Sequence, residues 1–124
     1  YAIDGVEGPF LELKAGNTYR FDQSDSTNAS HPLLFYYDAG KTTAFSTGVT
    51  TNGTPGSAGA YTQIVVSDTT PHILYYQCSS HPYMGNRIAV NSKVLQDVSF
   101  VSSTGSAVSF ETNAFAIAQA VALG

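Results

Sequence analysis

The sequence predicts an all-β protein, specifically a Greek-key antiparallel β-sandwich with a C-terminal extension. Short segments alternate apolar and polar residues, which is the pattern of half-buried strands. Clusters of Gly, Pro, Asn, Asp and Ser separate these segments at short intervals. Six or seven such strands before residue 91 are typical of a sandwich. The 124 residues are enough for one domain with a buried core.

The first predicted strands lie in the N-terminal third of the chain. Residues 10–13 alternate apolar and polar side chains up to a turn at 14–17, and residues 18–21 resume the alternation. Residues 22–30 are polar and predict a loop. Residues 31–37 form the next apolar segment, in which His31 shares a face with every second residue that follows.

The middle of the chain predicts a long surface loop followed by three strands. Residues 46–60 are rich in Thr, Gly and Ser, so at most a short strand is expected there. Residues 61–67 and 72–78 are rich in β-branched and aromatic residues and predict two strong strands. Residues 87–90 predict a further strand.

The sequence divides into a domain over residues 1–91 and an extension over residues 92–124. In the extension, residues 98–110 predict a hairpin around a Ser-Thr-Gly-Ser turn. Residues 114–123 are apolar and predict either a short helix, capped by Thr112 or Asn113, or a strand. Either element has to pack on the sandwich or on another chain. A homo-oligomer or larger assembly through residues 92–124 is therefore an open expectation.

The composition argues against two classes of partner. Charged residues make up 11% of the chain, the net charge is −4, and the five cations are scattered. Binding to a nucleic acid backbone needs clustered Lys and Arg, so no nucleic acid partner is expected. No run of 18 apolar residues occurs, so no membrane span is expected.

The single cysteine, Cys78, excludes an intramolecular disulfide. A lone thiol in an oxidising compartment needs protection, and metal ligation supplies it. The chain opens at Tyr1 without a signal-peptide pattern, which predicts a mature product or an excised piece of a longer protein.

Residues 78–84 read Cys-Ser-Ser-His-Pro-Tyr-Met and hold the only cysteine and the only methionine of the chain. A thiolate, an imidazole and a thioether form a soft ligand set that suits copper better than calcium, magnesium or manganese. A trigonal His₂Cys site with a weak axial Met is the arrangement for one-electron copper transfer. The second imidazole has to come from a neighbouring strand, and His31, at the start of an apolar strand, fits that need.

The local spacing supports such a site. A strand delivers Cys78 at its end, His81 can turn back three residues later, and Met84 follows after three more. Pro82 fixes φ within the loop, and Gly85 permits a sharp exit. We expect the fold to hold the ligands in place with or without metal.

These residues resemble those of the cupredoxin (type 1 blue copper) family. Residues 75–84 are most similar to the C-x-x-H-x-x-M ligand loop of the amicyanins, including its His-Pro-aromatic-Met ending, and residues 9–21 resemble the first two cupredoxin strands. The resemblance covers roughly residues 1–91. It implies one copper ion, cycling between Cu⁺ and Cu²⁺, with His31, Cys78 and His81 in the trigonal plane and Met84 as the axial ligand.

The same resemblance implies electron transport to a redox partner protein, no enzymatic activity, and a periplasmic or extracellular location. Two positions depart from the family pattern: Pro32 stands where cupredoxins often have an Asn that ties the ligand loops together, and Gln77 stands where plastocyanins have a Tyr. Both departures bear on the identity of the redox partner.

A looser likeness gives an alternative function. The segments 4–5, 21–25, 31–33 and 53–56 resemble cupredoxin-like domains of marine bacterial and phage surface proteins. That likeness implies a structural or interaction module of an extracellular, virion or filament assembly, with copper structural or absent. Copper storage or delivery is a third hypothesis.

Other residues that suggest chemistry have simpler interpretations. His72 lies at the far end of the strand that carries Cys78, so we interpret it as an ordinary turn histidine. The aspartates match no calcium-loop pattern, and no G-x-S-x-G segment supports nucleophilic catalysis. The glycosylation pattern at Asn28 directly precedes His31, and we interpret it as chance. Tyr83 is expected in an apolar collar around His81.

Overall fold

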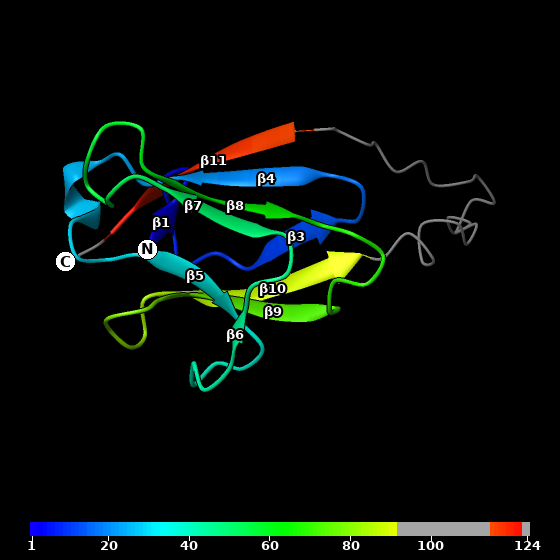
Figure 1. The fold of residues 1–124 in the computed structure, drawn as a ribbon. Helices are drawn as coiled ribbons and strands as arrows, with labels where there is room; N and C mark the ends of the chain where they lie inside the picture. The colour runs from blue at the N-terminus through cyan, green and yellow to red at the C-terminus, as the bar shows by residue number, and fades with distance from the viewer. Residues whose placement is uncertain (92–114, 123–124) are drawn as a thin grey trace, which may run out of the picture.

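The chain folds into two β-sheets that pack face to face (Figure 1). The computed structural model describes residues 1–91 and 115–122. One sheet has the strand order β2 (Val6–Glu7), β1 (Ala2–Ile3), β11 (Phe115–Val121), β4 (Thr18–Asp22), β8 (Tyr61–Val65) and β7 (Val49–Asn52). The other has the order β3 (Leu11–Lys14), β10 (Asn86–Asn91), β9 (Ile73–Cys78), β5 (Leu33–Tyr36) and β6 (Ala44–Phe45). The predicted all-β sandwich is confirmed, and its Greek-key connectivity stays a prediction.

The longer strands form where the sequence predicted them, and the shortest ones escaped prediction. Strands β3, β4, β5, β8, β9 and β10 lie within two residues of the expected ranges. Strand β7 is the short strand expected inside the 46–60 loop, whereas β1, β2 and β6 have two residues each and show no periodicity. A 3₁₀ turn spans Ser26–Asn28. Within the described ranges, no helix is long and apolar enough to cross a membrane.

The core lies between the two sheets and follows the alternation of the strands. On β9, Leu74, Tyr76 and Cys78 are all 0% exposed, as expected for the inward face. Phe21 of β4 meets Phe35 of β5 across the core, with ring centroids 5.5 Å apart in a T-shaped arrangement. Each fully buried side chain of this size contributes about 1.5–3 kcal/mol. Cys78 is therefore part of the hydrophobic core as well as a candidate ligand.

Two strand pairs depart from the antiparallel pattern that the sequence predicted. β3 pairs in parallel with β10, and β4 pairs in parallel with β11. The tight turn at residues 15–17 moves the chain from one sheet to the other, so β3 and β4 do not pair with each other. Each instead pairs with a strand from much later in the sequence. The remaining pairs of the described strands are antiparallel.

The last described segment is a strand, so the helical alternative for residues 114–123 is wrong. β11 lies inside the six-stranded sheet, between β1 and β4, and Figure 1 shows it alongside β4. Ala120 and Ala122 are buried, and the carbonyl of Ala120 accepts a hydrogen bond from Asn28 Nδ2 at 2.8 Å. Residues 115–121 thus belong to the sandwich. The hairpin predicted at 98–110 lies outside the described residues, and the boundary at residue 91 stays a prediction.

Gly85 allows the β9–β10 loop to pass close to its own strand. A Cβ atom at this position would lie 1.5 Å from the carbonyl oxygen of Tyr76, far inside any real contact. Gly85 N also donates to Gln77 Oε1 at 3.2 Å. The loop can therefore close above β9 only if residue 85 is glycine.

We predict that Gly85→Ala destabilises the fold by about 3 kcal/mol, because the clash involves backbone that cannot move without breaking the β9–β10 pairing. Gly59→Ala is the matched control. Gly59 has φ +82° but no atom within 4 Å of an added Cβ, so only the backbone cost of about 1–2 kcal/mol is expected. Urea unfolding followed by circular dichroism measures both. An equal decrease in the free energy of unfolding for the two variants would contradict the close approach at Gly85.

Candidate metal centre

The antiparallel pairing of β5 with β9 sets up the candidate metal centre. Leu33 pairs with Cys78 in this register. Extending the register by two residues places His31 opposite Ser80, just beyond the last paired residues. The β9–β10 loop then brings His81 back over the same end of the sheet. Sheet geometry therefore brings together two segments that lie far apart in the sequence.

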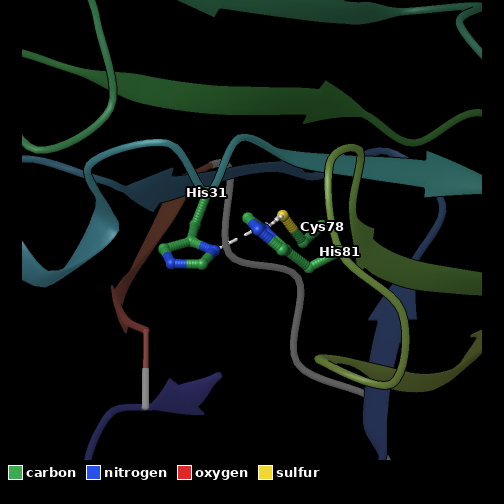
Figure 2. A group of neighbouring side chains, drawn as sticks. All are labelled: His31, Cys78 and His81. Carbon is green, nitrogen blue, oxygen red and sulfur yellow. Dashed lines mark hydrogen bonds between the residues drawn. The ribbon is translucent and has the colours of Figure 1, made fainter. Parts of the chain in front are cut away.

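His31, Cys78 and His81 converge on one point (Figure 2). Cys78 Sγ lies 3.7 Å from Nδ1 of His31 and 3.7 Å from Nδ1 of His81. The two imidazole ring centroids are 4.6 Å apart and tilted by 46°. The three candidate ligand atoms all lie within 4.8 Å of one another. Three of the four ligands predicted from the sequence are thus brought together.

These distances fit a metal ion shared by the three side chains. Metal–sulfur distances of about 2.3 Å and metal–nitrogen distances of about 2.0–2.1 Å are typical of thiolate and imidazole ligands. With an angle of about 110–120° at the metal, sulfur and nitrogen then lie about 3.6–3.8 Å apart. The 3.7 Å separations fall in this range. Both sulfur–nitrogen distances therefore suit a shared metal ion, and the group could hold one.

Burial is graded across the three side chains. Cys78 is 0% exposed, His31 is partly buried, and His81 is exposed. The sulfur also accepts a hydrogen bond from Ser80 N at 3.4 Å. The Cys78 sulfur is consequently shielded from solvent, and His81 forms the solvent-facing edge of the candidate centre.

Met84, the fourth predicted ligand, lies at the end of the same loop. It is partly buried and packs against the core cluster that contains Cys78. Its carbonyl oxygen accepts a hydrogen bond from the backbone nitrogen of Tyr1. Its role as an axial ligand stays a prediction.

The two ligand-bearing segments are joined by a backbone hydrogen bond. Ser79 N donates to Pro32 O at 3.0 Å, so the residue after Cys78 is tied to the residue after His31. The acceptor is the carbonyl of Pro32, so a proline after His31 does not prevent the link between the two segments.

A buried glutamine fixes the segment that carries His31. Gln23 is 1% exposed, and its side-chain amide donates from Nε2 to His31 O at 2.8 Å and accepts from Leu33 N at 2.9 Å. Thr62 Oγ1 donates to Leu33 O at 2.7 Å from the opposite sheet. The amide spans Pro32, which has no N–H to contribute. Sequence reasoning missed Gln23, because a polar residue after a strand normally predicts a surface loop.

Tyr1 contacts both ligand segments. Its hydroxyl donates to His31 O at 2.7 Å, and its backbone nitrogen donates to Met84 O. Burial raises the pKa of the Tyr1 hydroxyl, and the charge of a Cys78 thiolate adds to the shift. The hydroxyl therefore stays protonated and remains a hydrogen-bond donor near the centre.

The β5–β6 connection is stabilised by the carboxylate of Asp38. Asp38 Oδ1 accepts hydrogen bonds from Thr42 N at 3.0 Å and from Thr43 N at 3.1 Å. These amides, that of Thr42 foremost, lower the pKa of the Asp38 carboxyl. The charged carboxylate thus stabilises this loop at neutral pH.

Two other sequence candidates lie outside the centre. His72 Nδ1 is 3.3 Å from the carbonyl of Val90, at the opposite end of β10 from the ligand loop. Asn28, the residue of the glycosylation pattern, is 0% exposed and donates from Nδ2 to Ala120 O. The first placement agrees with the interpretation of His72 as a turn histidine, and the burial of Asn28 agrees with a chance match to the glycosylation pattern.

Comparison of the chain with protein-family models, with curated proteins and with solved structures finds no significant match.

We predict that Gln23→Leu destabilises the protein by about 2–3 kcal/mol, because His31 O and Leu33 N lose their buried partner. Metal affinity should fall about 10- to 100-fold, as is typical when a group that orients a ligand is lost. Gln63→Leu is the control, since Gln63 is partly exposed and accepts from Arg20 away from the centre; a loss of under about 1 kcal/mol is expected. Urea unfolding measures the stability and metal competition measures the affinity. Unchanged metal affinity in Gln23→Leu would contradict the role of Gln23 in positioning His31.

We predict that the stabilisation supplied by Asp38 depends on pH. Because the pKa of Asp38 is lowered in the folded protein, its stabilisation is complete above the unfolded value of about 3.9 and is lost as the pH falls through the folded value. The difference in unfolding free energy between the wild type and Asp38→Asn should be constant from about pH 7 to pH 5 and shrink below about pH 4. Chemical unfolding at several pH values measures it. A difference that grows towards low pH would contradict the assignment.

Proposed function

We propose that this protein is a type 1 copper-binding protein of the cupredoxin kind that transfers single electrons. The observation that carries the proposal is the buried Cys78 sulfur, placed at equal 3.7 Å distances from an imidazole nitrogen of His31 and of His81. The two histidines come from separate segments that meet at one end of a β-sandwich. This is the ligand set and the scaffold that one-electron copper sites use.

The chemistry of the donor set favours copper over zinc. A thiolate, two imidazoles and a nearby thioether are soft ligands that suit copper in both oxidation states. Structural zinc sites usually have four strong ligands, from Cys and His in tetrahedral geometry. Copper also stands above zinc in the general order of affinity for divalent metals. When bound, copper would supply the one-electron couple between Cu⁺ and Cu²⁺.

The protein surroundings favour electron transfer over a reaction on a substrate. The segments that carry His31 and Cys78 are held by Gln23 and by the Ser79–Pro32 hydrogen bond, so the ligands need not move when the metal changes charge. Cys78 is sealed in the core, whereas His81 is exposed. The imidazole of His81 is thus the short route between the centre and a redox partner at the surface.

The assembly alternative has lost part of its support. One of its supports was the apolar segment at residues 114–123, which was expected to pack on the sandwich or on another chain, and residues 115–121 pair with β4 and β1 of the same chain. A periplasmic or extracellular location belongs to the main proposal, because ligation protects a lone thiol in an oxidising compartment.

We predict that the purified protein binds one equivalent of Cu²⁺ and develops intense visible absorption from thiolate-to-copper charge transfer, with the EPR spectrum of a type 1 site. Cys78→Ser should abolish the absorption, because the thiolate is its source. Met84→Leu should keep the absorption but change the EPR parameters and the reduction potential, as expected for an axial ligand. His72→Ala is the control and should match the wild type.

Tight binding of Zn²⁺ with no coloured copper complex would contradict the copper proposal and leave a structural metal site. Absorption that persists in Cys78→Ser, or copper binding that needs His72, would contradict the assigned ligands. A coloured complex that exchanges electrons only very slowly would favour copper storage over electron transfer.

A further inference from the structure

A lysine from a separate loop donates hydrogen bonds to the backbone of residues 78–84, the ligand loop. Lys41, in the connection between β5 and β6, donates from Nζ to the carbonyl of Cys78 at 2.9 Å and to the carbonyl of His81 at 3.1 Å. Both carbonyls belong to candidate metal ligands. A single ammonium group thus bridges the first and the fourth residue of the ligand loop.

The backbone of Lys41 is held in an uncommon conformation. Its φ of +59° lies in the left-handed region, which residues other than Gly, Asn and Asp rarely adopt. Lys41 N donates to Asp38 O at 3.2 Å, and the Asp38 carboxylate accepts from the two amides that follow Lys41. This turn therefore offsets the cost of the strained backbone and aims the side chain at the ligand loop.

A second contact joins the same two loops. Gln77, the residue before Cys78, donates from Nε2 to Ala39 O at 3.4 Å and accepts from Gly85 N at 3.2 Å. The β5–β6 connection therefore contacts the ligand loop through two different side chains. Lys41 is the one that brings a positive charge.

We propose that Lys41 is a positioning residue of the metal centre, which holds Cys78 and His81 in place and favours the reduced state of the bound metal. The proposal rests on the proposed copper function. Hydrogen bonds to an ionised donor are stronger than neutral ones, and these two fix the backbone of both ligands. A fixed positive charge close to the centre disfavours the oxidised state, which carries one more positive charge, and so raises the reduction potential.

Three variants separate charge from position. Lys41→Met removes the charge and the donors while keeping much of the chain length, and Lys41→Arg keeps both. Lys14→Met removes the same charge at the far end of the sheet, where Lys14 pairs with Asn91. Protein-film voltammetry of the copper form and amide hydrogen exchange of residues 79–85 in the metal-free form are measured for each variant.

We expect Lys41→Met to lower the reduction potential and to speed amide exchange of the ligand loop about 5- to 10-fold in the metal-free protein. Lys41→Arg should retain most of the wild-type potential, and Lys14→Met should leave potential and exchange unchanged. If Lys41→Met matches Lys14→Met in both measurements, the proposal is wrong. If Lys41→Met lowers the reduction potential but does not speed amide exchange, Lys41 acts through its charge alone, and its positioning role is wrong.

The two proposals can fail separately. A wild-type protein without the thiolate–copper absorption overturns the copper function and with it the effect of Lys41 on the potential. The hydrogen exchange of the metal-free variants still decides whether Lys41 holds the loop.

Discussion

The register of β5 on β9 is the constraint on which the metal centre depends. Because Leu33 pairs with Cys78, His31 falls beside the end of β9 and not somewhere else along it. A slip of one residue would turn the inward faces of the strand outward and expose Leu33 and Phe35, which are both 0% exposed. Burial of the core thus fixes the position of a histidine that lies outside the core. Packing energy and site geometry are set by the same pairing.

Buried polar groups around the candidate centre stabilise it because each forms a hydrogen bond within the protein, where water cannot supply one. The side-chain amide of Gln23 hydrogen-bonds to His31 O and to Leu33 N, on either side of Pro32. Thr62 donates to Leu33 O from the other sheet. An unpaired buried polar group costs more than a formed hydrogen bond contributes, so such a network tolerates few arrangements. Contacts within the protein therefore hold the segment that carries His31 in place.

The sequence predicted the parts of the centre that depend on local spacing, and it missed the parts that depend on tertiary contact. Cys78 and His81 are three residues apart, and His31 stands at the start of an apolar segment. Both are local patterns that the sequence alone reveals. Gln23 and Lys41 act through backbone atoms distant in the sequence, which no local pattern encodes. The parallel pairing of β11 with β4 was missed for the same reason, since an apolar run fits a helix or a central strand equally well.

The place of β11 also links one edge of the six-stranded sheet to the candidate centre. β1 is hydrogen-bonded within the sheet to β2 and to β11, and Tyr1 beside it contacts His31 and Met84. In the described sheet, β1 and β2 connect to β4 only through β11, so residues 115–121 have to pair before this edge of the sheet can form. The contacts of Tyr1 with His31 and Met84 consequently depend on a strand that carries no candidate ligand, and a change in β11 should reach the candidate centre through β1.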